Sequence, residues 1–295
     1  MRCSNYKLYY KEFKLFRLFK NIFRILLLTL IIGVLVLCYA RYIEPHMLQV
    51  KDVTITSSRL SADANNLKIA VFGDTHFNDY YSTEDFNKVL NAIEEMKPDM
   101  VVFVGDLIDY YDIYTEDVND ISDKLSEIEA PYGKFAIFGN HDYGGGAETE
   151  YESIMAAGGF TVLKNKYQAI DELGISLIGI DDVLIGYGEP TVASWGRPDY
   201  FNIILAHEPD VIDEVLDYNV DLMISGHTHG RQVNIKFFDK YVLPPYGKKY
   251  INGLYQLDND RESQLYVNSG IGMTKLPYRF LSPPELTCIT LTNQQ

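Results

Sequence analysis

Apolar runs of two kinds divide this chain of 295 residues. One run, residues 25–40, is long and uncharged. Beyond it, short apolar runs alternate with segments in which apolar residues recur every three or four positions. Short continuous runs are typical of strands buried on both faces, and the longer period is typical of helices that cover them. The alternation predicts an α/β fold in which helices and sheets form layers.

The individual elements can be placed from this pattern. Apolar side chains at positions 86, 89, 90, 93 and 96 predict a helix over 82–97, with Ser82 or Thr83 as its N-cap and Pro98 beyond its end. Further helices are expected at about 115–129, 147–157 and 209–217. Strands are expected at 48–56, 67–74, 99–106, 133–142, 160–170, 174–182, 200–209, 220–230, 231–238, 264–272 and 285–292.

The long run predicts a transmembrane helix over residues 22–43, because about 20 apolar residues span a bilayer. Residues 1–21 are basic, which holds the N-terminus in the cytoplasm and leads the rest of the chain outside the cell membrane as a single-pass signal-anchor protein. Cleavage after the small-residue sequence "CYA" and release of the body is the open alternative. Residues 44–65 are then a juxtamembrane segment with the first strand, and residues 66–295 form the main domain.

Charge is divided along the chain in the same way. Residues 1–41 hold eight Lys and Arg against one acid, and the remainder holds 18 against 40. The resulting net charge of −22 on the body repels the phosphates of nucleic acids, and no basic stripe compensates for it. The acidic body argues against a nucleic-acid partner and suits the binding of cations.

Polar clusters follow five of the predicted strands. In open α/β sheets, ligands bind at the carboxyl ends of strands, so these clusters are expected to meet in one place. Five of the six histidines belong to them, and His46 is expected on the juxtamembrane surface. The clusters are Asp74 and His76 in "GDTH", Asp106 in "GDL", Asn140 and His141 in "GNHD", His207 in "AHEP", and His227 and His229 in "GHTH".

This set of side chains points to divalent metal ions. Carboxylates and imidazoles bind Mn, Fe and Zn, and seven candidate ligands exceed the three or four of one catalytic zinc. They suit two metals about 3.5–4 Å apart that clamp a phosphoryl group, with an Asp from a middle strand as the bridge. Residues two apart on an extended segment point the same way, so Asp74 and His76 are expected to share one direction, and so are His227 and His229.

The ordered motifs resemble those of the calcineurin-like metallophosphoesterase superfamily over residues 66–295. The single anchor and the ending "VNSGIGMTKLPYRFLSPPELTCITL" resemble a branch of small membrane-anchored bacterial phosphoesterases. The resemblance implies a four-layer α/β/β/α sandwich preceded by one transmembrane helix. It also implies a hydrolase of phosphodiester or pyrophosphate bonds.

The resemblance further implies a role for each motif residue. His141 would be the catalytic acid rather than a ligand, and Asp142 would orient it. Two divalent ions of Mn, Fe or Zn would be bound. One would take Asp74, His76, Asp106 and His229, and the other would take Asp106, Asn140, His207 and His227, with Asp106 as the bridge.

The substrate is expected to be a phosphoester, with lipid-linked or envelope compounds as candidates. Similar proteins cleave lipid-linked UDP-sugars, which makes a UDP-2,3-diacylglucosamine-type pyrophosphate one candidate. The alternative function is a catalytically silent envelope module that binds metal or a partner. His141 argues against it, because a pure binding module has no need of an acid that is not a ligand.

Several features keep two interpretations. Arg231 stands where similar proteins often have glycine, and it either holds a substrate phosphate or is a solvated charge at a strand edge. Arg279 has the same two interpretations. The loop 143–148 is either a mobile lid or a plain connector. The tyrosines of "DYYS" and "DYYDIY" either line a groove for sugars or lipids or pack the loops.

Overall fold

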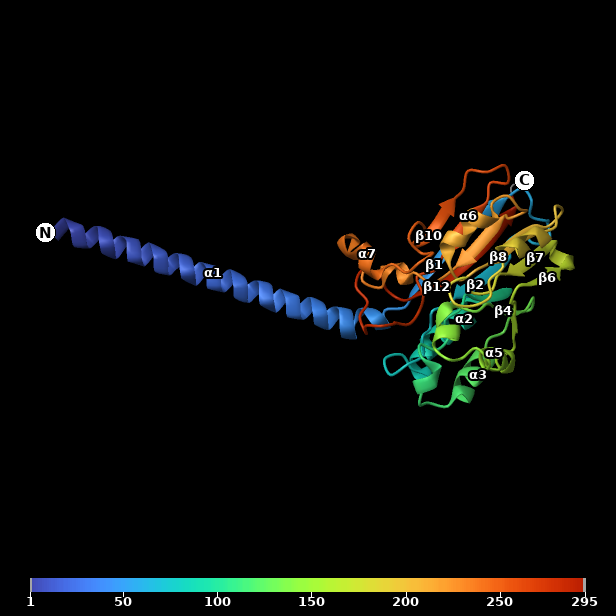
Figure 1. Cartoon of the computed structure of the whole chain (residues 1–295), viewed down its shortest axis with the longest axis horizontal. Helices are drawn as coiled ribbons and strands as arrows, with labels where there is room; N and C mark the ends of the chain where they lie inside the picture. Colours follow the sequence, from blue (N-terminus) through green and yellow to red (C-terminus); the bar gives the residue numbers. More distant parts are fainter. Residues whose placement is uncertain (1, 294–295) are drawn as a thin grey trace.

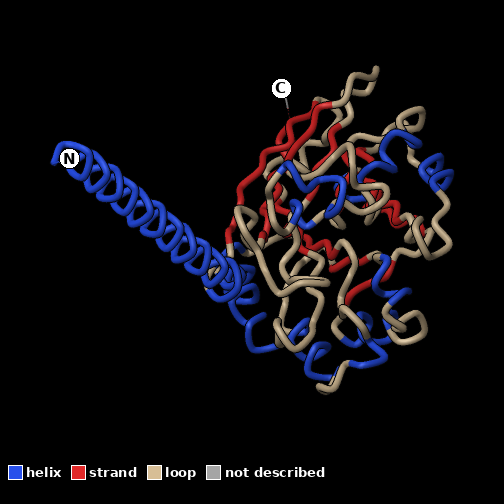
Figure 2. The backbone as a smooth tube through the Cα atoms, turned by 60° about the vertical axis from the view of Figure 1, so that its left-hand side comes forward, coloured by secondary structure: helices blue, strands red, loops and turns tan. Residues whose placement is uncertain are grey.

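A single long helix projects from a layered body in the computed structural model, which describes residues 2–293 (Figure 1). This helix, α1 (Arg2–Tyr42), contains the predicted span 22–43. Within the described residues it is the one helix long and apolar enough to cross a membrane. Figure 2 shows that α1 meets the body only at its C-terminal end.

Two six-stranded mixed sheets form the body within the described part of the chain. The strand order is β1-β12-β2-β3-β4-β5 in the first sheet and β10-β11-β9-β8-β7-β6 in the second. Strand β12 runs antiparallel to β2, and β10 and β6 run antiparallel to their neighbours, while the remaining pairs are parallel. The strands of the first sheet are β1 (Gln49–Ser57), β2 (Lys68–Phe72), β3 (Met100–Phe103), β4 (Lys134–Ala136), β5 (Phe160–Val162) and β12 (Glu285–Asn293). Those of the second are β6 (Lys166–Ile170), β7 (Ile175–Gly179), β8 (Phe201–Leu205), β9 (Leu222–Ser225), β10 (Gly253–Gln256) and β11 (Gln264–Val267).

Helices cover the outer faces of both sheets. The larger layer lies on the first sheet and consists of α2 (Thr83–Met96), α3 (Val118–Ser126) and α5 (Tyr151–Ala157), and the short α4 (Asn140–Gly144) follows β4. The second sheet is covered by α6 (Ile212–Val215) and the 3-10 turns η4 (Pro190–Trp195) and η5 (Pro209–Val211). The remaining short elements are η1 (Glu44–His46), η2 (Tyr111–Ile113), η3 (Asp171–Leu173), η6 (His229–Arg231), η7 (Lys236–Phe238) and α7 (Asp239–Val242).

Side chains that point alternately to the two faces of each sheet build three apolar cores among the described residues. Strand β2 is an example. Ile69 and Val71 face the second sheet, whereas Ala70 and Phe72 face the helices. Both faces are therefore buried, which explains why the strands read as continuous apolar runs. The expected four-layer α/β/β/α sandwich after one N-terminal apolar helix is confirmed.

Most predicted elements are present, often with shorter bounds. α2 begins as expected, because Ser82 accepts a hydrogen bond from the Asp85 N–H and Asp85 accepts one from the Ser82 N–H. The strand predicted over 231–238 is wrong. Arg231 and Gln232 have φ values of 77° and 56°, which a strand does not allow, and one isolated bridge joins Val233 to Phe280. Strand β10 and helices α4 and α7 were not predicted.

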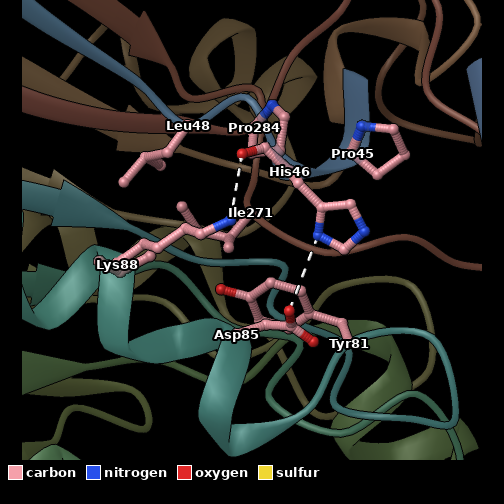
Figure 3. A pocket seen from close by; sticks show the side chains of 9 residues that line it. Pro45, His46, Leu48, Tyr81, Asp85, Lys88, Ile271 and Pro284 are labelled. Carbon is pink, nitrogen blue, oxygen red and sulfur yellow. Dashed lines mark hydrogen bonds and ion pairs between the residues drawn. The ribbon is translucent and has the colours of Figure 1, made fainter. Parts of the chain in front are cut away.

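The end of α1 is fixed to the body without a linker. The Arg279 N–H donates to the Ala40 carbonyl at 2.9 Å, and the Ser282 N–H donates to Glu44 Oε1 at 2.6 Å. Figure 3 shows His46 beside α2, where its Nδ1 lies 3.7 Å from an Asp85 oxygen. The His46 side chain is 38% exposed, so its expected surface position is correct.

Candidate metal centre

The polar clusters meet where strands of both sheets end. Asp74 and His76 follow β2, Asp106 follows β3, His207 follows β8, and His227 and His229 follow β9. Distances between their side-chain atoms are 3.0–3.4 Å, although the residues lie up to 153 positions apart in the chain. The expected convergence at the carboxyl ends of the strands is therefore present.

The backbone of these residues is not extended, which corrects the argument from strand alternation. The φ values are 47° at Asp74, 41° at His76, 59° at Asp106, 73° at His227 and 51° at His229. Each left-handed residue that is not glycine costs on the order of 1 kcal/mol, and such residues cluster at functional sites. The side chains are thus aimed by sharp turns after the strands, and not by the pleat within them.

Two glycines let these turns approach each other. A Cβ at Gly139 would lie 2.3 Å from Asp106 Oδ1, and a Cβ at Gly226 would lie 2.4 Å from Asp74 Oδ2. Each glycine precedes one ligand motif and faces the carboxylate of another. The spacing of the centre therefore requires glycine at both positions.

The Asp106 carboxylate lies between histidines of the two sheets. Its Oδ2 is 3.4 Å from His76 Nε2 and 3.2 Å from His207 Nε2. The Nδ1–H of His207 donates to the Val104 carbonyl at 2.6 Å, so Nε2 is the ring nitrogen that faces Asp106 and would be the one to bind a metal ion. Among the described residues, this buried Nε2 has no hydrogen-bond partner.

A second group of atoms surrounds His76. Its Nδ1 contacts Asp109 Oδ1 at 3.1 Å, and its Nε2 lies 3.0 Å from His229 Nε2. His229 Nε2 is in turn 3.4 Å from Asp74 Oδ1. The Nδ1–H of His76 therefore points to a carboxylate, and its Nε2 faces further lone pairs. Metal-binding histidines commonly show this pattern.

His227 completes the second-sheet side of the centre. Its Nε2 contacts the Pro245 carbonyl at 2.8 Å, so Nδ1 is the ring nitrogen that remains for a ligand. Its ring centre lies 4.9 Å from that of His207. Asn140 and His141 line the pocket beside these rings. All residues predicted from the motifs thus lie at one place.

Asp109 is a site residue that the sequence analysis missed. Its Oδ1 contacts His76 Nδ1 at 3.1 Å and His141 Nδ1 at 3.2 Å, and it accepts a hydrogen bond from Thr274 at 2.7 Å. The His141 Nδ1 also lies 2.9 Å from the Asp109 carbonyl. Asp109 therefore positions both the His76 ring, which faces Asp106, and His141, which is the candidate acid.

Asp142 has a different role from the expected one. Its carboxylate accepts hydrogen bonds from the N–H groups of Gly139, Asp106 and Leu107 at 2.8–2.9 Å. It therefore ties the loop after β4 to the loop after β3. The carboxylate that contacts the His141 ring belongs to Asp109.

The charges of the centre favour a cation at its middle. Burial lowers the pKa of His76, but hydrogen bonds to Asp106 and Asp109 outweigh this and raise it to about 10. Burial raises the pKa of Asp74 to about 6 against the opposing effect of His207. Burial and then the positive His207 lower the pKa of His227 to about 3. The carboxylates thus retain a positive charge among them, and some rings stay neutral.

Arg231 lies at the pocket, where its role toward a substrate stays a prediction, whereas Arg279 differs from both of its expected settings. Arg231 lines the pocket of about 280 Å³ in front of the centre, but its guanidinium binds Asp239 at 2.7 and 2.9 Å. Arg279 is fully buried, so it is neither a solvated charge nor open to substrate. It donates to the carbonyls of Ser269, Gly270, Gly272 and Ser282, and its Nη2 lies 3.4 Å from His229 Nδ1.

The glycine loop and the tyrosines are also placed. The Asp112 N–H donates to the Gly145 carbonyl at 3.1 Å, so loop 143–148 packs on its neighbour as a connector would. Tyr81 is buried and serves packing, whereas Tyr80 and Tyr110 are half exposed and line a groove of about 150 Å³ that also includes Asp109. The tyrosines therefore divide between packing and the lining of a groove, and the binding of sugars or lipids there stays a prediction.

These residues fit divalent metal ions. Three groups of carboxylate and imidazole atoms lie within 4.8 Å of one another, formed by Asp74, His76 and His229, by Asp74, Asp106 and His207, and by His76, Asp109 and His141. Lone pairs of Nε2 atoms and carboxylate oxygens face each other at 3.0–3.4 Å. Such facing lone pairs repel each other unless a proton or a cation lies between them. Nitrogen and oxygen donors together suit Mn, Fe or Zn.

Comparison with known proteins agrees with this chemistry. The family model of calcineurin-like phosphoesterases matches residues 67–231. The metallophosphoesterase YkuE of Bacillus subtilis is 42% identical over 86% of this chain and 88% of that protein. A metallophosphoesterase of Aquifex aeolicus is 29% identical over 88% of this chain and 97% of that protein. The UDP-2,3-diacylglucosamine pyrophosphatase LpxG of Chlamydia muridarum is 26% identical over 87% of this chain and 92% of that protein.

The position of Asp109 leads to a test. Asp109→Asn removes the charge that holds His76 and His141, so metal affinity and phosphoesterase activity should each fall roughly 10–100-fold. Calorimetric titration with Mn²⁺ and turnover of an aryl phosphodiester measure the two effects. Asp112→Asn, an exposed acid of the same segment, is the matched control. Normal values in both variants would show that Asp109 does not position the rings.

Proposed function

Because this chain belongs to the calcineurin-like phosphoesterase family, it is a hydrolase of phosphoric ester bonds, and we propose that it is a membrane-anchored enzyme with two divalent ions. Its proposed substrates are phosphodiesters or pyrophosphates of the cell envelope. The site supports an enzyme over a silent binding module, because His141 is held beside the candidate ligands by Asp109.

The close approach of two histidine nitrogens to one oxygen of Asp106 is the observation on which the proposal depends. His207 Nε2 is buried and has no hydrogen-bond partner among the described residues, and it faces Asp106 Oδ2 at 3.2 Å. His76 Nε2 faces the same oxygen at 3.4 Å. Since His76 follows a strand of one sheet and His207 a strand of the other, Asp106 suits a bridge between two cations.

The two proposed ion sites use the residues that the motifs predicted. The first sheet and His229 supply one set, and the second sheet with Asn140 supplies the other. The first set is Asp74, His76, Asp106 and His229, and the second is Asp106, Asn140, His207 and His227. When bound, divalent ions supply positive charge that polarises a phosphoryl group and acidifies water.

The chain itself supplies the proposed proton donor and the contacts that orient it. His141 is the proposed acid that protonates the leaving oxygen, and its Nδ1 is held by the Asp109 carbonyl and carboxylate. Its backbone N–H also donates to Asp106 Oδ1 at 2.8 Å, which fixes the acid relative to the proposed bridge. A ring held at Nδ1 presents Nε2 to the pocket for proton transfer.

A lipid-linked pyrophosphate is the proposed substrate class. The similar protein LpxG is named for a UDP-2,3-diacylglucosamine pyrophosphatase activity. The pocket before the centre combines site residues with apolar side chains, including Leu184, Val233 and Leu276. A substrate with a pyrophosphate and acyl chains would match both kinds of lining.

The proposed location is the outer face of the cell membrane. The predicted span lies in α1, and the basic residues before it favour a cytoplasmic N-terminus. Cleavage and release remains the alternative. An outward site would separate the enzyme from cytosolic nucleotides and bring it close to envelope lipids.

Metal stoichiometry tests the bridge. Asp106→Asn should lower both metal content and activity, because the carboxylate neutralises charge between two cations. Elemental analysis of the purified full chain measures the content, with the exposed Asp63→Asn as control. At most one ion per fully active chain would refute the two-ion arrangement.

Leaving-group dependence tests His141. His141→Ala should keep near-normal metal and folding but lose typically 10²–10⁴-fold in turnover of esters with poor leaving groups. Activated aryl esters need less protonation and should lose less. His46→Ala changes a histidine outside the centre and is the control. Equal loss on both ester types together with lost metal would make His141 structural, and full activity on both would make it a bystander.

Protease accessibility tests the orientation. Protease added to intact cells or protoplasts should digest the chain beyond about residue 45, since the basic flank directs the body outward. Immunoblotting against the N-terminus and the body reports the cleavage. Digestion only after lysis would place the body in the cytoplasm.

A further inference from the structure

The end of the anchor helix sits directly against the loops around the metal centre. The Ala40 carbonyl accepts the Arg279 N–H at 2.9 Å, and the Tyr39 ring contacts the Phe280 ring edge-on. The Arg41 guanidinium lies 4.9 Å from the centre of the Tyr80 ring. Because these contacts leave no linker, a bilayer spanned by α1 would lie against the face of the body around the helix end.

The same face contains the mouth of the metal-centre pocket. Arg279 is bonded to the helix end through its N–H, and its side chain lies 3.4 Å from His229 Nδ1. Ser282 joins the two in the same way, since its N–H donates to Glu44 and its hydroxyl donates to the His229 carbonyl at 2.8 Å. Leu276 in the same loop lines the pocket. Arg279 and Ser282 therefore each contact both the end of the anchor segment and His229 of the centre.

Exposed apolar side chains lie on the two segments that also contribute residues to this mouth. We call segments 233–246 and 276–281 the membrane rim. Leu276 and Leu281 are 63% and 61% exposed, and Phe237 is 82% exposed. Figure 1 shows α7, at the centre of the first segment, on the side of the body from which α1 leaves. Apolar side chains gathered in this way mark a surface that binds another apolar phase or partner.

The charge of the rim differs from that of the body. Residues 231–249, which include and flank the first rim segment, contain five Lys and Arg and one acid, with Arg231 paired to Asp239 and Lys249 to Asp213. Residues 264–284 contain the exposed Lys275 and no acid, and their Arg279 is buried. The rest of the body is strongly acidic. Lys236, Lys248 and Lys275 are exposed beside the apolar side chains. Basic side chains interleaved with apolar ones suit the anionic head groups and acyl boundary of a bilayer.

We propose that the membrane rim docks on the lipid surface of the bilayer that α1 spans and seats the pocket mouth on that surface. A lipid-linked substrate would then reach the centre with its acyl chains still in the membrane. The proposal rests on the proposed anchored phosphoesterase, but it can fail on its own. It predicts contact between rim side chains and acyl chains whatever the substrate is.

The single tryptophan of the chain allows a direct measurement. Trp195 lies near the amino end of β8, whereas the metal centre lies at the carboxyl ends of the strands. The neighbouring Gly196 is held there, because its carbonyl accepts a hydrogen bond from Asn219. The unmodified full chain therefore reports on the far edge. Trp195→Phe combined with Leu281→Trp, or with Leu276→Trp, moves the fluorophore to the rim. Each protein is reconstituted in phosphatidylcholine–phosphatidylglycerol vesicles with or without brominated acyl chains.

Brominated lipid should quench the emission at positions 276 and 281 and leave that of Trp195 unchanged. A second variant pair avoids dependence on apolar changes. Lys236→Glu with Lys248→Glu should lower the ratio of turnover on a vesicle-borne pyrophosphate to turnover on a soluble aryl diester. Lys166→Glu, on the edge strand β6, should leave this ratio as it is.

Three outcomes would overturn the docking proposal. They are unquenched emission at both rim positions, equal quenching at all three positions, and crosslinking of the rim to a second copy of the chain in place of lipid contact. Failure of the proposed function is a separate result. It would appear as no hydrolysis of the soluble diester by the unmodified chain with Mn²⁺, while the quenching measurement would still be informative.

Discussion

The carboxylate of Asp106 lies between residues of the two sheets, and the arrangement of the metal centre depends on the fixed position of this negative charge. Its Oδ2 faces a histidine from each sheet, its Oδ1 accepts the His141 N–H, and its own N–H donates to Asp142. Left-handed backbone at five neighbouring residues and two glycines without room for a side chain are the structural cost of this approach. A fold with two sheets packed face to face, whose strands end at the same side, is well suited to supply ligands from both.

The sequence predicted the features of this arrangement that local residue patterns determine, and it missed those that depend on tertiary contacts. The strands and their order of motifs were predictable, because strands buried on both faces leave continuous apolar runs that end in polar residues. The gathering of Asp74, His76, Asp106 and the later histidines followed from the carboxyl-end rule for α/β sheets. Their left-handed φ values did not, since turn geometry after a strand is a tertiary property.

The misses have the same origin. Residues 231–238 alternate like a strand, but positive φ at Arg231 and Gln232 turns the chain toward the pocket. Asp109 lies three residues after Asp106 and begins the stretch "DYYDIY", which was considered only for its tyrosines, so only the fold reveals its contacts with His76 and His141. The buried Arg279 was expected in solvent or at a phosphate, because sequence alone does not show that four carbonyls surround it.

The place of β12 in the first sheet has a consequence for biogenesis. This last strand lies between β1 and β2, and Lys51 on β1 meets Glu285 on β12 across 234 residues of chain. The first sheet cannot close until residues 285–293 have left the ribosome, and pairings of such long range form slowly. A body that stays unfolded for this long is compatible with threading through a narrow translocation channel behind its N-terminal helix. The same delay exposes apolar strands before they pair, so the growing chain would depend on chaperones that cover these strands until β12 has been made.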